Sequence, residues 1–236
     1  MSRILLQVKK IPYEIVWMNY EDIERVAKEV GAEPTTKKMD GTPLYTIPFI
    51  TVTTDANQRP LAISDSTRIA YYLEKLVPEP VMIPKGTDAF HAAFSQCCTN
   101  LLITMFPLAI ESYADALVSR DHFWNSRVDL IGRRSEDIVA KGDAVEQTWK
   151  ALEQELDKVA GYLDTNVREG VSPDEAENHR TLVMGDRRSY ADIHLVSMLL
   201  FTARFIPGGW KRIKGRNGGR WERLMKLYAE YLPPYA

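Results

Sequence analysis

The segment that decides the fold runs from Tyr45 to Leu73 and reads YTIPFITVTTDANQRPLAISDSTRIAYYL. It predicts a strand that carries Pro48, a second short strand from Pro60 to Ile63, and a helix that opens at Ser64-Asp65-Ser66. A proline removes a hydrogen-bond donor from a ladder, so Pro48 is expected at a sheet edge, at a bulge or after a cis peptide bond. This makes Ile47 a candidate for backbone contact with a ligand.

The helix start at Asp65 and Ser66 can be interpreted in two ways. Serine and aspartate ahead of an apolar run at helical spacing (Ile69, Leu73, Leu76) are common N-terminal caps. A helix N-terminus also attracts carboxylates, because its first backbone N–H groups have no partner within the helix. The cap alone is the simpler interpretation, and the proline-bearing strand upstream favours a platform that binds a peptide.

The composition narrows the class of protein. Of the 236 residues, 45% are hydrophobic, enough for a packed core, and 30 basic residues nearly balance 32 acidic ones. We therefore expect neither a nucleic-acid partner nor a membrane partner. The apolar run at the N-terminus is too short for a signal peptide, so we expect none, and the most apolar stretch, from Leu101, contains a proline and two carboxylates. A cytoplasmic protein with reduced Cys97 and Cys98 is the expectation.

The sequence offers little for metal or nucleotide chemistry. Its four histidines (His91, His122, His179 and His194) lack H-x-x-x-H or H-x-H spacing, and the adjacent cysteines lack a C-x-x-C step. We therefore predict no metal site. Without G-x-S-x-G, Walker or G-x-G-x-x-G motifs, hydrolase, NTPase and dinucleotide-binding functions lose their usual support.

Upstream of the deciding segment, the pattern predicts the end of a helix, an extended run and a second helix. Residues 3–9 have helical spacing, residues 13–18 are rich in β-formers, and residues 20–30 place apolar side chains on one face. The loop that follows carries Lys37 and Lys38. Surface lysines are most often merely solvated, and this is the simpler interpretation of the pair.

A proline-rich connection from Glu79 to Lys85 divides the chain into domains over residues 1–80 and 86–236. The second domain has helical patterns throughout. We expect a long helix over 88–118 bent at Pro107, a second over 135–166 with a break at Gly142, an acidic loop, a buried helix, and a last helix from Trp221. Ser189 and Asp192 have the spacing of a capping box at the start of the buried helix.

Two clusters of side chains each allow a structural and a functional interpretation. The aromatic cluster consists of Phe106, Tyr113, Phe123 and Trp124, and aromatic residues on helices belong to a core more often than to a pocket. The basic run from Lys211 to Arg223 follows Trp210 directly and contains Trp221. Because the whole protein is slightly acidic, we interpret this run as a solvated loop and helix flank and not as a nucleic-acid site.

The order and spacing of these motifs resemble the glutathione transferases, especially the fungal FuA class and the bacterial β-aryl-etherases. The resemblance rests on TIPFI (46–50) and ISDSTRIAYYLEK (63–75), on the preceding residues 10–35, and on the helices that follow. The run 120–138 also matches that group, with Phe123, Arg127 and Gly132 in corresponding places. The implied fold is α/β plus all-α: a thioredoxin-like first domain, then an all-helical domain.

The resemblance also implies glutathione as a substrate and assigns its contacts. Lys38 would reach the glycyl carboxylate, and the strand with Ile47 and Pro48 would hold the tripeptide. The Ser66 hydroxyl and the helix amides would bind the γ-glutamyl carboxylate, and Asp65 would meet the ammonium group. The acceptor site for hydrophobic aromatic compounds would be walled by Phe106, Tyr113, Phe123 and Trp124.

Three functions are compatible with this resemblance. The first is transfer of glutathione to hydrophobic aromatic compounds, or their reductive cleavage, as in detoxification. The second is a non-catalytic carrier, or ligandin, that keeps the pocket. The third is a structural or regulatory interaction module built on the helical domain.

The alignment with the family places Met1 inside the first helix. The first strand and the loop with the catalytic serine would then lie upstream, so we expect an incomplete sheet, an unknown catalytic residue, and weak or absent conjugation by this chain. We also predict a homodimer, because the helices from Asp65 and from residue 88 are expected to expose Tyr71, Tyr72 and Phe94.

Overall fold

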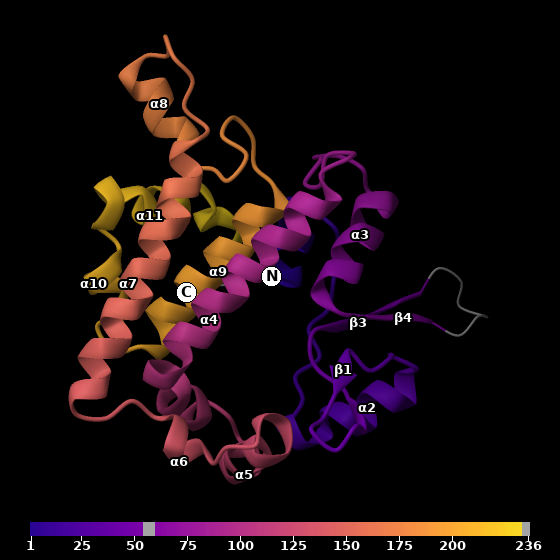
Figure 1. The fold of residues 1–236 in the computed structure, drawn as a ribbon. Helices are drawn as coiled ribbons and strands as arrows, with labels where there is room; N and C mark the ends of the chain where they lie inside the picture. The colour runs from indigo at the N-terminus through magenta and orange to yellow at the C-terminus, as the bar shows by residue number, and fades with distance from the viewer. Residues whose placement is uncertain (54–59, 233–236) are drawn as a thin grey trace.

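Two domains lie side by side in the computed structural model. The structure describes residues 1–53 and 60–232, and for residues 127–131 it describes the backbone alone. Figure 1 shows a small α/β domain with α2, α3 and the strands beside a bundle built around α4, α7 and α9. The fold is a thioredoxin-like domain with few strands followed by an all-helical domain, as the resemblance implies.

The first domain contains three α-helices, one 3-10 helix and four short strands within the described residues. They are α1 (Ser2–Val8), η1 (Tyr20–Asp22), α2 (Ile23–Val30), β1 (Thr36–Lys37), β2 (Pro43–Leu44), β3 (Phe49–Val52), β4 (Leu61–Ser64) and α3 (Ser66–Leu76). β1 pairs with β2, and β3 pairs with β4, both antiparallel. Gly31 ends α2 with φ 81°, a left-handed conformation that glycine adopts without steric cost.

The extended run over 13–18 joins neither of these two ladders. Its side chains Val16 and Trp17 are 76% and 77% exposed. The peptide bond between Ile47 and Pro48 is cis, one of the three arrangements that the sequence allows there.

The second domain is helical throughout the described residues. Its elements are α4 (Asp88–Asp115), α5 (Arg120–Ile131), α6 (Ser135–Ile138), α7 (Asp143–Asp164), α8 (Pro173–His179), α9 (Tyr190–Phe205), α10 (Gly209–Ile213), α11 (Arg216–Leu227) and η2 (Ala229–Tyr231). α4 is long and apolar enough to cross a membrane, but the core helix of a globular protein passes the same test. Because α4 packs along both α7 and α9, we assign it to the core.

Several helix boundaries differ from the sequence patterns. The helix predicted over 135–166 is divided into α6 and α7, and Gly142 with φ 55° precedes α7, which confirms the predicted break. The acidic loop contains α8, because Ser172 caps the Glu175 N–H and Pro173 occupies the first turn. α11 begins before Trp221, with a left-handed kink over Asn217–Gly219 inside it.

The exposure predicted for Tyr71, Tyr72 and Phe94 is only partly correct. Tyr71 is 36% exposed and Tyr72 is half-buried, but Phe94 is 5% exposed within the main hydrophobic core. Phe90, one turn earlier on α4, is 41% exposed instead. Residues four apart on a helix lie on nearly, but not wholly, the same face. The prediction failed because α4 points Phe94 into the core, although Phe90 is partly exposed.

The capping box predicted for Ser189 and Asp192 is present at the start of α9. The Asp192 carboxylate is fully buried and accepts from the Ser189 N–H at 2.6 Å, the Ser189 hydroxyl at 2.9 Å and the Val183 N–H at 2.7 Å. Burial raises the pKa of Asp192 to about 6, although these hydrogen bonds oppose the shift. The carboxylate therefore joins α9 to the preceding loop.

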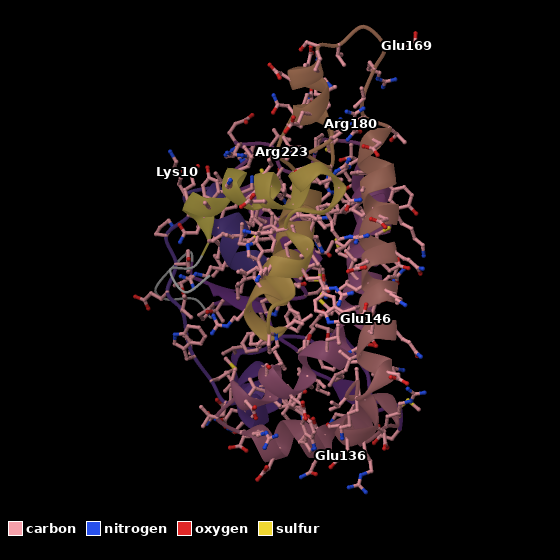
Figure 2. All side chains as sticks on the ribbon, turned by 90° about the vertical axis from the view of Figure 1, so that its left-hand side faces the viewer. Lys10, Glu136, Glu146, Glu169, Arg180 and Arg223 are labelled. Atoms are coloured by element: carbon pink, nitrogen blue, oxygen red, sulfur yellow. The ribbon has the colours of Figure 1, made fainter. Side chains whose placement is uncertain are left out.

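Four arginines of the basic run pair with acidic side chains of α7 and α8, whereas the sequence indicated a solvated flank. Ion pairs join Arg212 to Glu146 and Glu153 (both 2.7 Å), Arg216 to Asp157 (3.0 Å), Arg220 to Asp164 (2.7 Å) and Arg223 to Glu177 (3.0 Å). The Arg212 guanidinium also lies 4.6 Å from the Trp149 ring centroid. Figure 2 shows Glu146 toward one end of α7 and Arg180 by the other. Four of the basic residues thus fasten α10 and α11 to their neighbours.

Replacement of Asp192 by alanine tests the role of the capping box. We expect a loss of about 3–5 kcal/mol in the free energy of unfolding, because the cap is lost and two buried N–H groups lose their acceptor. Urea denaturation followed by circular dichroism measures the change. Asp143→Ala is the control, because Asp143 lies in the first turn of α7 but is exposed and forms no box. Its expected cost is below about 1 kcal/mol, and equal costs for both variants would contradict the prediction.

Candidate functional site

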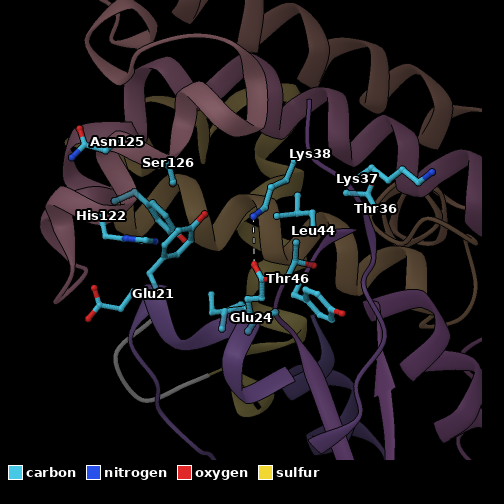
Figure 3. Close-up of a pocket in the computed structure, with 15 residues that line it drawn as sticks. Glu21, Glu24, Thr36, Lys37, Lys38, Leu44, Thr46, His122, Asn125 and Ser126 are labelled. Carbon is cyan, nitrogen blue, oxygen red and sulfur yellow. Dashed lines mark hydrogen bonds and ion pairs between the residues drawn. The ribbon is translucent and has the colours of Figure 1, made fainter. Parts of the chain in front are cut away.

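A cavity of about 720 Å³ lies where the two domains meet. Its lining comes from α2, β1, β2 and the segment before β3 in the first domain, and from α4 and α5 in the second. The lining residues are Tyr20, Glu21, Ile23, Glu24, Thr36, Lys37, Lys38, Leu44, Tyr45, Thr46, Ile47, Tyr113, His122, Asn125 and Ser126. Figure 3 shows His122, Asn125 and Ser126 across the cavity from Leu44 and Thr46.

The first-domain wall of the cavity is charged. Lys37 and Lys38 both line it, and the Lys38 Nζ lies 3.4 Å from Glu24 Oε2, the contact drawn in Figure 3. Glu24 also accepts from Lys28 at 2.7 Å, and these lysines hold the pKa of Glu24 below its usual range. The Lys38 ammonium is therefore fixed at the cavity by one carboxylate, which it shares with Lys28.

The second-domain wall combines polar groups with aromatic rings. His122, Asn125 and Ser126 recur at three- and four-residue spacing, so the helix α5 presents them on one face. Tyr20 of η1 crosses between the domains, with its ring centroid 5.2 Å from Phe123 in an edge arrangement and 6.0 Å from His122. This aromatic contact joins the two domains beside the cavity, which Tyr20 and His122 both line.

The predicted acceptor-site aromatics gather in one cluster, but only Tyr113 among them lines the cavity. The Tyr113 ring lies 5.3 Å from Phe123 and 6.4 Å from Phe106. Phe123 is 2% exposed, and Phe106 and Trp124 are half-buried against the same small core. The side chain of Arg127 lies outside the described residues.

Sequence reasoning missed His122, Asn125 and Ser126 as cavity residues, and their helical spacing was the available signal.

The residues predicted to bind glutathione lie on two neighbouring segments of the first domain. Lys38 and Ile47 line the cavity, and Ile47 is 56% exposed. Pro48, Asp65 and Ser66 are not among its lining residues. Pro48 lies directly before β3, and Asp65 and Ser66 lie at the turn from β4 to α3. The pairing of Phe49 with Ser64 in these two strands places the two segments next to each other.

The turn at Asp65 has an unusual backbone. Asp65 has φ 74° and ψ 128°, a region that residues with a side chain rarely adopt. Its Oδ1 accepts from the Thr67 N–H at 2.8 Å and from the Arg68 N–H at 3.0 Å, so the carboxylate caps α3. The predicted cap is thus confirmed, and it occupies one carboxylate oxygen.

Comparison with known proteins assigns the chain at the level of a family. The model for the glutathione S-transferase N-terminal domain matches residues 1–76, and the model for the C-terminal domain matches residues 89–231. The glutathione S-transferase-like protein ustS of Aspergillus flavus is 23% identical over 241 residues, which cover 98% of this chain and 82% of that protein.

Two solved fungal structures agree with the whole fold. Glutathione transferase GSTFuA3 from Phanerochaete chrysosporium is 32% identical with a TM-score of 0.81, over 98% of this chain and 88% of that one. CsGST63524 of Ceriporiopsis subvermispora, solved in complex with glutathione, is 32% identical with a TM-score of 0.83, over 100% of this chain and 91% of that one. With both domains matched, this chain belongs to the glutathione S-transferase family.

Proposed function

We propose that this protein binds glutathione and transfers it to hydrophobic aromatic compounds or cleaves such compounds reductively. The observation that carries the proposal is the interdomain cavity, which has a charged wall with Lys37 and Lys38 on the first domain and an aromatic and polar wall on the second. The glutathione complex of the Ceriporiopsis relative supports the choice of ligand, because the two chains share their fold over the full length of this one.

The charges around the site suit glutathione, which carries two carboxylates and one ammonium group at neutral pH. We assign Lys38 to the glycyl carboxylate and the Ser66 hydroxyl, with the α3 N-terminus, to the γ-glutamyl carboxylate. Oδ1 of Asp65 accepts the capping hydrogen bonds, so we assign Oδ2 to the ammonium group. Ile47 and Pro48 supply backbone and shape for the cysteinyl residue between these ends.

The chemistry requires glutathione in its thiolate form beside the acceptor. A free thiol has a pKa near 8.5, so a bound glutathione gains reactivity when its environment favours the thiolate. In conjugation, the sulfur forms a bond to an electrophilic carbon, and the leaving group departs with its electron pair. The aromatic ring of Tyr113 and the α5 side chains offer a surface on which an aromatic acceptor would stack.

A non-catalytic carrier is the second candidate function. It is favoured by the size of the cavity, which would hold an aromatic molecule without any reaction. An interaction module built on the helical domain would need neither glutathione nor the cavity.

Retention on immobilised glutathione and turnover distinguish these functions. We expect the protein to be retained and eluted by free glutathione, which would exclude a pure interaction module. With a chlorinated aromatic acceptor we then expect only a slow loss of the thiol signal above the uncatalysed rate, because the catalytic residue of this chain is unknown and its conjugation is expected to be weak. Retention without turnover would assign the carrier function, and no retention would refute the proposal as a whole.

Replacement of Ser66 by alanine tests the assigned carboxylate contact. A charge-assisted hydrogen bond contributes about 1.5–3 kcal/mol, so the Kd for glutathione should rise about tenfold or more by isothermal titration calorimetry. Ser197→Ala is a matched control, because the Ser197 hydroxyl donates only to the Ile193 carbonyl within α9. Equal affinities for Ser66→Ala and the wild type, with the circular dichroism spectrum unchanged, would leave Ser66 as part of an ordinary cap.

We also propose a homodimer. Tyr71 on α3 and Phe90 on α4 are 36% and 41% exposed, and a second copy would cover such apolar side chains. Sedimentation velocity at micromolar concentration should give a species of twice 26.9 kDa. A single species at 26.9 kDa would refute the dimer.

Tyr71→Glu should shift a dimer toward monomer by placing a charge at the interface.

A further inference from the structure

Tyr190, the first residue of α9, joins the helical domain to both ends of α3. Its hydroxyl donates to the Ser66 carbonyl oxygen at 2.8 Å, a contact between residues 124 positions apart. Its backbone N–H donates to the Met82 carbonyl at 2.7 Å, and the Met82 N–H donates to the Glu74 carboxylate at 3.0 Å. One buried residue thus contacts the start of α3 directly and its last turn through the interdomain connection.

The turn that Tyr190 contacts is strained. Asp65 has φ 74° without being a glycine, and such a conformation persists only where the surrounding structure holds it. Two contacts hold this turn: the Asp65 carboxylate caps Thr67 and Arg68 from within, and the Tyr190 hydroxyl binds the Ser66 carbonyl from the other domain. The second contact joins the turn to α9 of the helical domain.

Tyr190 itself has little freedom to move. It is 1% exposed, and its ring packs edge-on against His194, with the centroids 4.6 Å apart. The capping box of Ser189 and Asp192 fixes the backbone beside it. Burial raises the pKa of Tyr190 to about 12, so the phenol keeps its proton and is a donor at neutral pH.

We propose that Tyr190 is a positioning residue for glutathione, because it holds the Ser66 turn in the orientation that meets the γ-glutamyl carboxylate. The inference rests on the proposed function of Ser66. Tyr190 does not touch the ligand in this role. It acts through the Ser66 carbonyl, to which its hydroxyl donates.

Tyr190→Phe removes this hydroxyl and keeps the ring and its packing. We expect the Kd for glutathione to rise about three- to tenfold, the loss associated with one neutral hydrogen bond. Tyr228→Phe is the matched control, because Tyr228 is 0% exposed and donates to the Ser189 carbonyl at 3.5 Å, in the same core but away from Ser66. We expect the control to bind as the wild type does. An unchanged Kd in Tyr190→Phe would overturn the inference.

A double-mutant cycle with Ser66→Ala separates positioning from general stability. If Tyr190 acts through Ser66, its replacement should have little further effect on the Kd once the Ser66 hydroxyl is gone. The same fold-change in both backgrounds would overturn the inference, because the hydroxyl would then act elsewhere. Loss of the folded circular dichroism spectrum in Tyr190→Phe would also overturn it, since Tyr190 would then be a general stability contact.

Hydrogen exchange gives a readout that needs no ligand. Without glutathione, Tyr190→Phe should increase amide exchange in residues 66–72, while α7 exchanges as in the wild type. Unchanged exchange at residues 66–72 would overturn the inference. A wild type that fails to bind glutathione would instead refute the proposed function, and the exchange experiment would still decide whether Tyr190 holds the turn.

Discussion

The buried carboxylate of Asp192 holds the start of α9, the helix from which Tyr190 reaches the first domain. It accepts three hydrogen bonds, from the backbone and hydroxyl of Ser189 and from the Val183 N–H, in a site without solvent. An unpaired carboxylate would be costly there, so the loop and the start of α9 are held together. Because Tyr190 directly follows Ser189, the same contact fixes the residue that binds the start of α3.

A second buried charge fixes the other end of α3. The Lys9 ammonium, with no exposed side-chain area, pairs with Glu74 at 2.8 Å and donates to the carbonyls of Val77 and Pro80. Glu74 also accepts from the Met82 N–H in the connection between the domains. α1, α3 and this connection therefore share one hydrogen-bonded centre.

The cavity has a two-sided character. Its lysine-bearing wall comes from short strands of the first domain, and its aromatic and polar wall comes from α4 and α5. Tyr20 spans the junction by packing against Phe123 and His122. Small-molecule sites commonly lie between two domains, because each domain can supply side chains of a different chemical kind.

The sequence by itself determined the local structure whose signals lie within a few residues: the Asp65 cap, the Ser189–Asp192 box and the break at Gly142. Only the tertiary structure decided which distant residues meet, because their contacts have no local spacing to reveal them. It paired the basic run with α7 and α8, where the sequence indicated a solvated flank. It likewise buried Phe94, placed His122 on the cavity wall and brought the Tyr190 hydroxyl to the Ser66 carbonyl, since tertiary packing decides which helix face is covered.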